Sequence, residues 1–155
     1  MKRLIKNILI TVALVSMVGV SPAFAGSGAK VEVYARVMPM VSVQVVNQPS
    51  VLNITPSDIE KGYVEVPAAT VLTVKTNSAY VIYFERVADD RLFEEIEVNT
   101  GTATTSIVTS QGMVYEPYPG SVHPSTKTIS YRFYLAESVE PGVYPWPVQV
   151  GVEAN

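Results

Sequence analysis

The sequence predicts an all-β protein, an antiparallel immunoglobulin-like β-sandwich of roughly seven to nine strands. Three observations support this fold class. Apolar residues recur at every second position through most of the chain, turn residues separate these runs, and no stretch has the apolar spacing of a long helix. A closed barrel is the alternative architecture. Neither an internal repeat nor a linker divides the chain, so we expect a single domain after the leader described next.

Residues 1–25 are expected to be a secretory signal peptide. Basic residues stand near the start, an apolar run covers 8–20, and Ala23 and Ala25 place small side chains at the two positions that a signal peptidase reads. The apolar run is about 13 residues long, whereas a helix needs roughly 20 to cross a bilayer, which argues against a membrane anchor. The domain is then residues 26–155, exported to the periplasm or the cell surface, with no membrane span after cleavage.

Charge and cysteine content exclude several function classes. The leader carries three of the eleven Lys and Arg residues and none of the fourteen Asp and Glu residues, so the exported chain has eight positive and fourteen negative side chains, a net charge of −6. No basic patch remains for nucleic acid or for an anionic membrane surface. The absence of cysteine excludes thiol catalysis, iron–sulfur clusters and disulfides, so burial and backbone pairing must stabilise the fold.

The first predicted strand pattern covers residues 31–45, where every odd position is apolar and the even positions are mixed. Pro39 keeps the phase but has no amide proton for a ladder, so it marks an edge strand, a bend, or the junction of two strands. A short helical turn should follow, capped by Thr55, opened by Pro56 and ended by Gly62.

The later strands are predicted from the same alternation and from their β-branched and aromatic residues. The stretch 88–99 is ambiguous, because its acids suit either a helical turn or a loop before a strand near 96–98. The segment 116–127 contains three prolines and is expected to be an exposed loop. The other predicted strands are 63–66, 71–75, 80–87, 102–109, 112–115, 129–135 and, after a Pro141-Gly142 turn, 144–152.

The closing segment GVYPWPVQVGVEA, residues 142–154, combines a turn glycine, Tyr144 and alternating valines. It resembles the last strand of spore-coat-U-like and archaic chaperone–usher pilin subunits and of other exported bacterial immunoglobulin-like domains. The chain departs from those subunits in two ways. They usually carry cysteines and this chain has none, and they usually have an aromatic last residue where this sequence has Glu153-Ala154-Asn155. The resemblance implies a structural subunit of a surface or periplasmic assembly.

The first alternating segment is long enough for two roles. It exceeds the roughly five or six residues of an average strand, so the part before Pro39 can complete the sheet of a neighbour, as in donor-strand addition. The alternative is a long first strand that bends at Pro39 and passes from one sheet to the other. The residues that we expect to bind a protein partner, or a second copy, are Val31, Val33 and Val37.

No constellation of residues indicates an enzyme, a metal site or a cofactor. The single histidine, His123, lies near Ser121 and Ser125 in a loop, and that spacing does not build a triad. One histidine without cysteine cannot hold zinc. The clustered acids predict a hydrated loop, with a weak calcium site as the alternative; they are Asp89, Asp90, Glu94, Glu95 and Glu97.

Aromatic residues offer a second functional hypothesis, a platform for a glycan or a peptide built from Tyr115, Tyr118 and Trp146. Tyr118 stands between two prolines and suits a surface position, whereas Trp146 shares the phase of the following valines, which favours packing in the core. The sequence therefore predicts a non-catalytic, exported structural or accessory protein that acts by strand pairing and apolar contacts. A glycan- or peptide-binding sandwich is the alternative.

Overall fold

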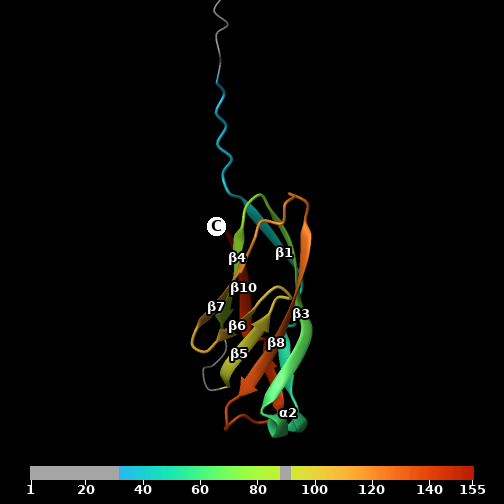
Figure 1. Cartoon of the computed structure of the whole chain (residues 1–155). Coiled ribbons are helices and arrows are strands. Elements are labelled where there is room, and N and C mark those ends of the chain that lie inside the picture. The colour runs from blue at the N-terminus through green and yellow to red at the C-terminus, as the bar shows by residue number, and fades with distance from the viewer. Residues whose placement is uncertain (1–31, 88–91) are drawn as a thin grey trace, which may run out of the picture. The chain divides into compact units, whose positions relative to one another are not determined.

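The computed structural model describes residues 32–87 and 92–155, and it separates the residues up to Arg36 from a compact body that begins at Val37. The described part of this body holds ten strands and one helix, and every strand pair is antiparallel (Figure 1). The prediction of an all-β chain with antiparallel sheets is confirmed. The predicted signal peptide lies outside the described residues, and none of the described helices is long and apolar enough to cross a bilayer.

The larger sheet has five strands in the order β1-β3-β8-β5-β6. The predicted strands 63–66 and 71–75 are one continuous strand of this sheet, because a register shift between Val66 and Thr70 accommodates the extra residues without ending the pairing. Ala68 takes a left-handed conformation there, with φ of 51°. The strands are β1 (Val41–Asn47), β3 (Tyr63–Thr76), β8 (Ser125–Leu135), β5 (Phe93–Asn99) and β6 (Thr104–Ile107).

The smaller sheet has the order β10-β4-β7, and a further pair of strands, β2 and β9, forms a ladder of its own. The predicted closing strand 144–152 is two strands, because Pro145 and Pro147 lack the amide protons that a continuous ladder needs. This break and the unpredicted β2 raise the number of strands above the expected range. The bounds are β10 (Val148–Ala154), β4 (Tyr80–Arg86), β7 (Gln111–Glu116), β2 (Val51–Ile54) and β9 (Gly142–Pro145).

Two ambiguous segments are resolved. The acidic stretch enters β5 as a strand, and its first residues, 88–91, lie outside the described residues. The predicted strand over 31–45 is only half correct: β1 begins at Val41, and residues 32–40 form no strand. Pro39 lies just before the first paired residue, where its missing amide proton interrupts no ladder.

The predicted helical turn is the helix α2 (Pro56–Lys61). Thr55 is the N-cap, and its hydroxyl accepts from the backbone N–H of Asp58 while the Asp58 carboxylate accepts from Thr55 N. These hydrogen bonds lower the pKa of Asp58. Gly62 ends the helix with φ of 80°, a left-handed conformation that glycine adopts without strain. The predicted cap, first residue and end of this helix are confirmed.

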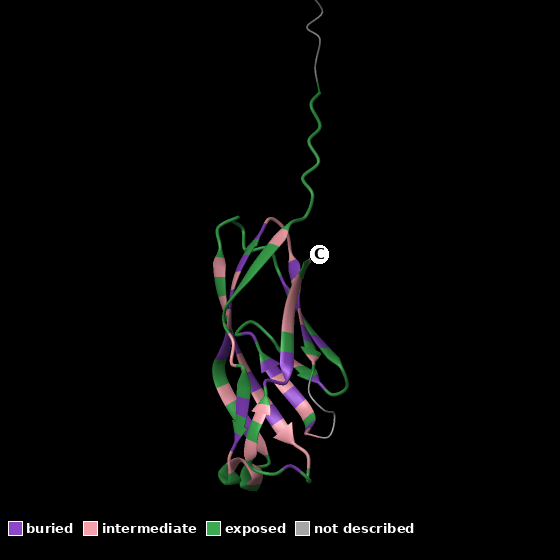
Figure 2. Ribbon diagram, turned by 180° about the vertical axis from the view of Figure 1, so that it is seen from behind, coloured by how far each residue is buried: buried purple, intermediate pink, exposed green. Residues whose placement is uncertain are grey.

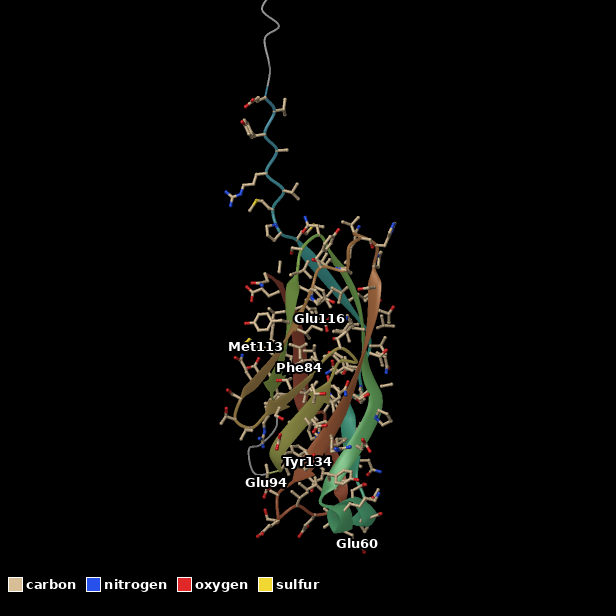
Figure 3. The ribbon with its side chains drawn as sticks, in the orientation of Figure 1. Glu60, Phe84, Glu94, Met113, Glu116 and Tyr134 are labelled. Atoms are coloured by element: carbon tan, nitrogen blue, oxygen red, sulfur yellow. The ribbon has the colours of Figure 1, made fainter. Side chains whose placement is uncertain are left out.

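Side chains from both sheets form one buried cluster, which gives the body a sandwich-like arrangement (Figure 2). Tyr131 and Phe133 stack with ring centroids 5.8 Å apart, and the Trp146 ring meets both edge-on, at 5.3 and 5.5 Å. Phe84 is fully buried and lies between the layers (Figure 3). Burying an aromatic side chain of this size contributes about 2–3 kcal/mol each, so this cluster supplies the stabilisation that cysteines do not.

Candidate partner-binding site

β1 is an edge strand of the larger sheet, and its free side carries unpaired backbone among the described residues. Asn77 N donates to Met40 O, which marks these two facing residues as a hydrogen-bonded pair. Bonded and non-bonded pairs alternate in antiparallel ladders, so Val41, Val43 and Val45 direct their N–H and C=O groups away from β3. The same three residues stand opposite buried residues of β3, so their side chains face the interior.

β10 is an edge strand of the smaller sheet with the same arrangement. Val87 N donates to Pro147 O, which fixes the alternation along this ladder. Val148, Val150 and Val152 therefore turn their backbone groups away from β4 while their side chains point toward its buried side. Val150 and Val152 thus each combine an apolar side chain with a backbone edge that no described strand pairs.

We call these two facing edges the β1–β10 margin, defined by Val41, Val43, Val45, Val148, Val150 and Val152. Gln48 Nε2 donates to the carbonyl of the first β10 valine, 3.0 Å away, and so covers one end of the margin. Val43 and Val45 are 41% and 48% exposed although their side chains face the interior. Apolar side chains that face a core and remain in water indicate that the margin is incompletely covered.

The opposite side of the body, where β6 meets β7, is closed. A short connection joins these strands, and Ile107 at the end of β6 is fully buried. A Cβ added to Gly112 of β7 would lie 3.0 Å from Ile107 Cγ1 and 3.3 Å from Thr105 Cγ2. The side chains of β6 therefore already occupy the space over Gly112 of β7.

The N-terminal arm, residues 31–37, contains the partner-binding residues predicted from the sequence. Val31 lies outside the described residues. Val33 is 84% exposed and Val37 is 77% exposed, so neither packs in a core. The Tyr34 hydroxyl donates to the Glu32 carboxylate, which raises the tyrosine pKa. The described arm residues are extended, exposed and apolar at alternate positions, which are the properties of a strand that lacks a sheet.

An asparagine side chain holds the chain between the arm and β1. Asn77 Oδ1 accepts from Met40 N at 2.7 Å, and Asn77 Nδ2 donates to Met38 O at 2.9 Å. The Thr76 hydroxyl also donates to Met40 O, at 3.0 Å. This amide bracket satisfies backbone groups on both sides of Pro39 and fixes the point from which the arm departs.

Glu116 forms the most buried charged cluster of the described residues. Its carboxylate is 2.6 Å from Lys127 Nζ, and it accepts hydrogen bonds from the hydroxyls of Thr102 and Thr100. A buried ion pair with satisfied oxygens ties β7 to β8 and to the turn before β6. Both carboxylate oxygens of Glu116 therefore have partners, and the cluster links three segments of the fold.

The three aromatic residues of the alternative hypothesis do not form one platform. Trp146 is buried in the core, 7% exposed, whereas Tyr115 on β7 is 69% exposed and Tyr118 in the following loop is 43% exposed. A ring that packs edge-on against two buried aromatic rings cannot also stack on a glycan. The phase argument that favoured packing for Trp146 is correct.

The described residues contain no group of three or more acidic, histidine or cysteine side chains that could hold a metal ion. His123 is exposed in its loop. Two acids of the predicted calcium site, Asp89 and Asp90, lie outside the described residues. Glu97 lies 3.9 Å from Arg132 in an ion pair between β5 and β8.

Comparison with protein families, with curated proteins and with solved structures finds no match for this chain. Its role is therefore inferred from the margin, the arm and the physical chemistry of strand pairing.

Proposed function

We propose that this protein is an exported, non-catalytic subunit of a surface or periplasmic assembly, an immunoglobulin-like sandwich that associates by β-strand addition at the β1–β10 margin. One observation carries the proposal: Val43 and Val45 face the interior and are nevertheless about half exposed, and their outward backbone groups have no partner among the described residues. A strand placed there gains backbone hydrogen bonds and buries valines in the same step.

The N-terminal arm of a second copy is the proposed occupant. It has no strand partner among the described residues, and Val33 and Val37 offer side chains that alternate with polar ones. Burying one such valine contributes about 1.5–2 kcal/mol. Edge strands normally carry charges or prolines that prevent this pairing, and the inward positions of the margin are all valine.

The resemblance of the closing segment to pilin subunits agrees with this proposal and supports an export route through the predicted signal peptide. The glycan- or peptide-binding alternative is weaker, because burial of Trp146 removes one of its three residues from the surface.

Size-exclusion chromatography with light scattering tests the proposal on residues 26–155 and on a form without residues 26–38. We expect the longer form to make dimers and higher oligomers and the shorter form to stay monomeric. Val33→Asp with Val37→Asp should abolish association, since charges cannot enter an apolar interior. The matched control, Glu32→Ser with Arg36→Ser, changes the other face of the arm and should still associate. Monomers in every form would refute strand addition.

A further inference from the structure

Gly151, in the middle of β10, lies beneath the ring of Tyr83 from the neighbouring strand. The two residues face each other in the β4–β10 ladder. A Cβ added to Gly151 would lie 2.0 Å from Tyr83 Cζ and 2.2 Å from Tyr83 Oη, far inside van der Waals contact. The outer end of the tyrosine ring therefore lies over the β10 backbone, and only glycine leaves room for it.

Tyr83 belongs to an apolar strip on the outer face of the smaller sheet, the face turned away from the core. Met113 is 54% exposed and lies on the outer side of this layer (Figure 3). Exposed apolar side chains in contact with one another mark interaction sites, and the Tyr83 ring carries this strip across β10 toward its free edge. A cavity of about 290 Å³ on this face is lined by Val81, Tyr83, Gln111, Met113 and Glu153.

Over seven residues each, the arm as defined above and β10 both alternate between inward-type and outward-type positions. By sequence, the arm has apolar residues at positions 31, 33, 35 and 37, and β10 turns its residues 148, 150, 152 and 154 toward the interior. If the arm is added to β10 with its apolar side toward the same interior, the four apolar arm residues lie beside the four inward-facing residues of β10. The midpoints of the two runs are Tyr34 and Gly151. These two become neighbours whether the arm runs parallel or antiparallel to β10.

We propose that Tyr34 of a second copy docks beside Gly151 and packs against Tyr83, which makes this contact a specificity determinant of the assembly. The proposal rests on the strand addition proposed above. Tyr34 stands on the polar side of the arm, so in the added strand its ring points to the outer face, where Tyr83 lies. Side chains on adjacent strands are about 4.5–5.5 Å apart at Cβ, and an aromatic ring readily covers a neighbouring strand glycine.

The same register brings charged residues together at Glu153, which is exposed on the outer face of β10. Glu153 becomes the neighbour of Arg36 if the arm runs parallel to β10, and of Glu32 if it runs antiparallel. Both directions leave Tyr34 beside Gly151, so a cross-link at either position reports the proposed register.

Cysteine cross-linking tests this register without interference, because the chain has no native cysteine. Glu153→Cys protein is mixed with Arg36→Cys or with Glu32→Cys protein and oxidised, and disulfide-linked dimers are counted on non-reducing gels. Facing residues on adjacent strands lie within disulfide reach. We expect one of the two mixtures to cross-link in high yield, and Ser57→Cys, on helix α2 at the other end of the body from the C-terminus (Figure 1), to give no more than background.

A double-mutant cycle tests the aromatic contact itself. Tyr34→Ala and Tyr83→Ala should each weaken association about fivefold, and the double variant should lose little more than either single variant. Tyr115→Ala is the matched control, because this exposed tyrosine lies on β7, which β10 and β4 separate from the added arm. It should leave association unchanged.

The outcomes separate this contact from strand addition in general. Oligomers that form without a cross-link in either mixture, or with additive effects of the two tyrosines, would overturn the Tyr34 contact and leave strand addition standing. A protein that stays monomeric in all forms would overturn both.

Discussion

The two sides of the sandwich-like body are built differently from similar residues. On the β6–β7 side, a short connection holds the strands together, and the Ile107 side chain fills the space over Gly112. On the β1–β10 side, Val43 and Val45 point inward but stay about half exposed beside unpaired backbone. Apolar alternation by itself thus does not close a fold: closure depends on whether the next strand comes from the same chain.

The largest expected effect lies on the closed side. Ile107→Ala should lower the free energy of unfolding by about 2–5 kcal/mol, because it leaves a cavity in a fully packed site. Val45→Ala on the margin should lower it by less than about 1 kcal/mol in the arm-deleted monomer, where the side chain is already half in water. Urea unfolding of both variants measures the difference, and equal losses would contradict the distinction between the two sides.

The next largest expected effect is on the pH dependence of stability, and it comes from Tyr131 in the interior between the two sides. Burial raises the pKa of Tyr131 to about 12, and this outweighs the hydrogen bond to Thr70 Oγ1, which acts in the opposite direction. In the unfolded chain the phenol ionises near pH 10. The stability linked to this group, roughly 2–3 kcal/mol, is therefore complete below about pH 10 and is lost as the pH rises toward 12.

Urea midpoints measured between about pH 9 and 12 should fall more steeply for the parent protein than for Tyr131→Phe, which has no proton to release. Tyr80, whose pKa burial also raises to about 12, remains in both forms, so the difference isolates Tyr131. Parallel curves would show that this ring is accessible to water in the folded state.

The smallest effect lies on the open side, at the amide bracket. Asn77→Ala removes two hydrogen bonds to Met38 and Met40 and should cost about 1–2 kcal/mol locally. Amide exchange of Met40 should accelerate while exchange in β8 stays unchanged. Asn77→Asp keeps an acceptor for Met40 N, so its Met40 exchange rate should lie between those of the parent protein and Asn77→Ala. Unchanged exchange in the alanine variant would mean that β1 alone orders this segment.

Local patterns in the sequence predicted much of the fold. The spacing of Thr55, Pro56 and Gly62 identified α2, because capping depends on neighbours in the chain. Alternation at Tyr80, Ile82 and Phe84 correctly identified a buried strand face. The pairing of β2 with β9 joins residues about ninety positions apart, and such register is set by tertiary packing that no local pattern contains.

The sequence predicted the arm of the candidate site but not the residues of the margin that would accept it. The alternating run is longer than one strand, so the sequence predicts a donor role for the arm valines, and this role stays a prediction. From the sequence, Val43 and Val45 belong to the apolar face of a first strand. Alternation predicts which way their side chains point, but not whether another element covers them. Tyr83 and Gly151 carried no signal of their own, since their contact depends on the register of two strands.

The arm and the margin are different surfaces of one chain, so the proposed contact can also be made head-to-tail, from each copy to the next. Each copy that joins occupies one vacancy and supplies another, and the growing fibre keeps one unfilled end at every length. Such a polymer has polarity, and its growth ends when its two ends join in a ring or when a terminal subunit fills the vacancy without offering a new one.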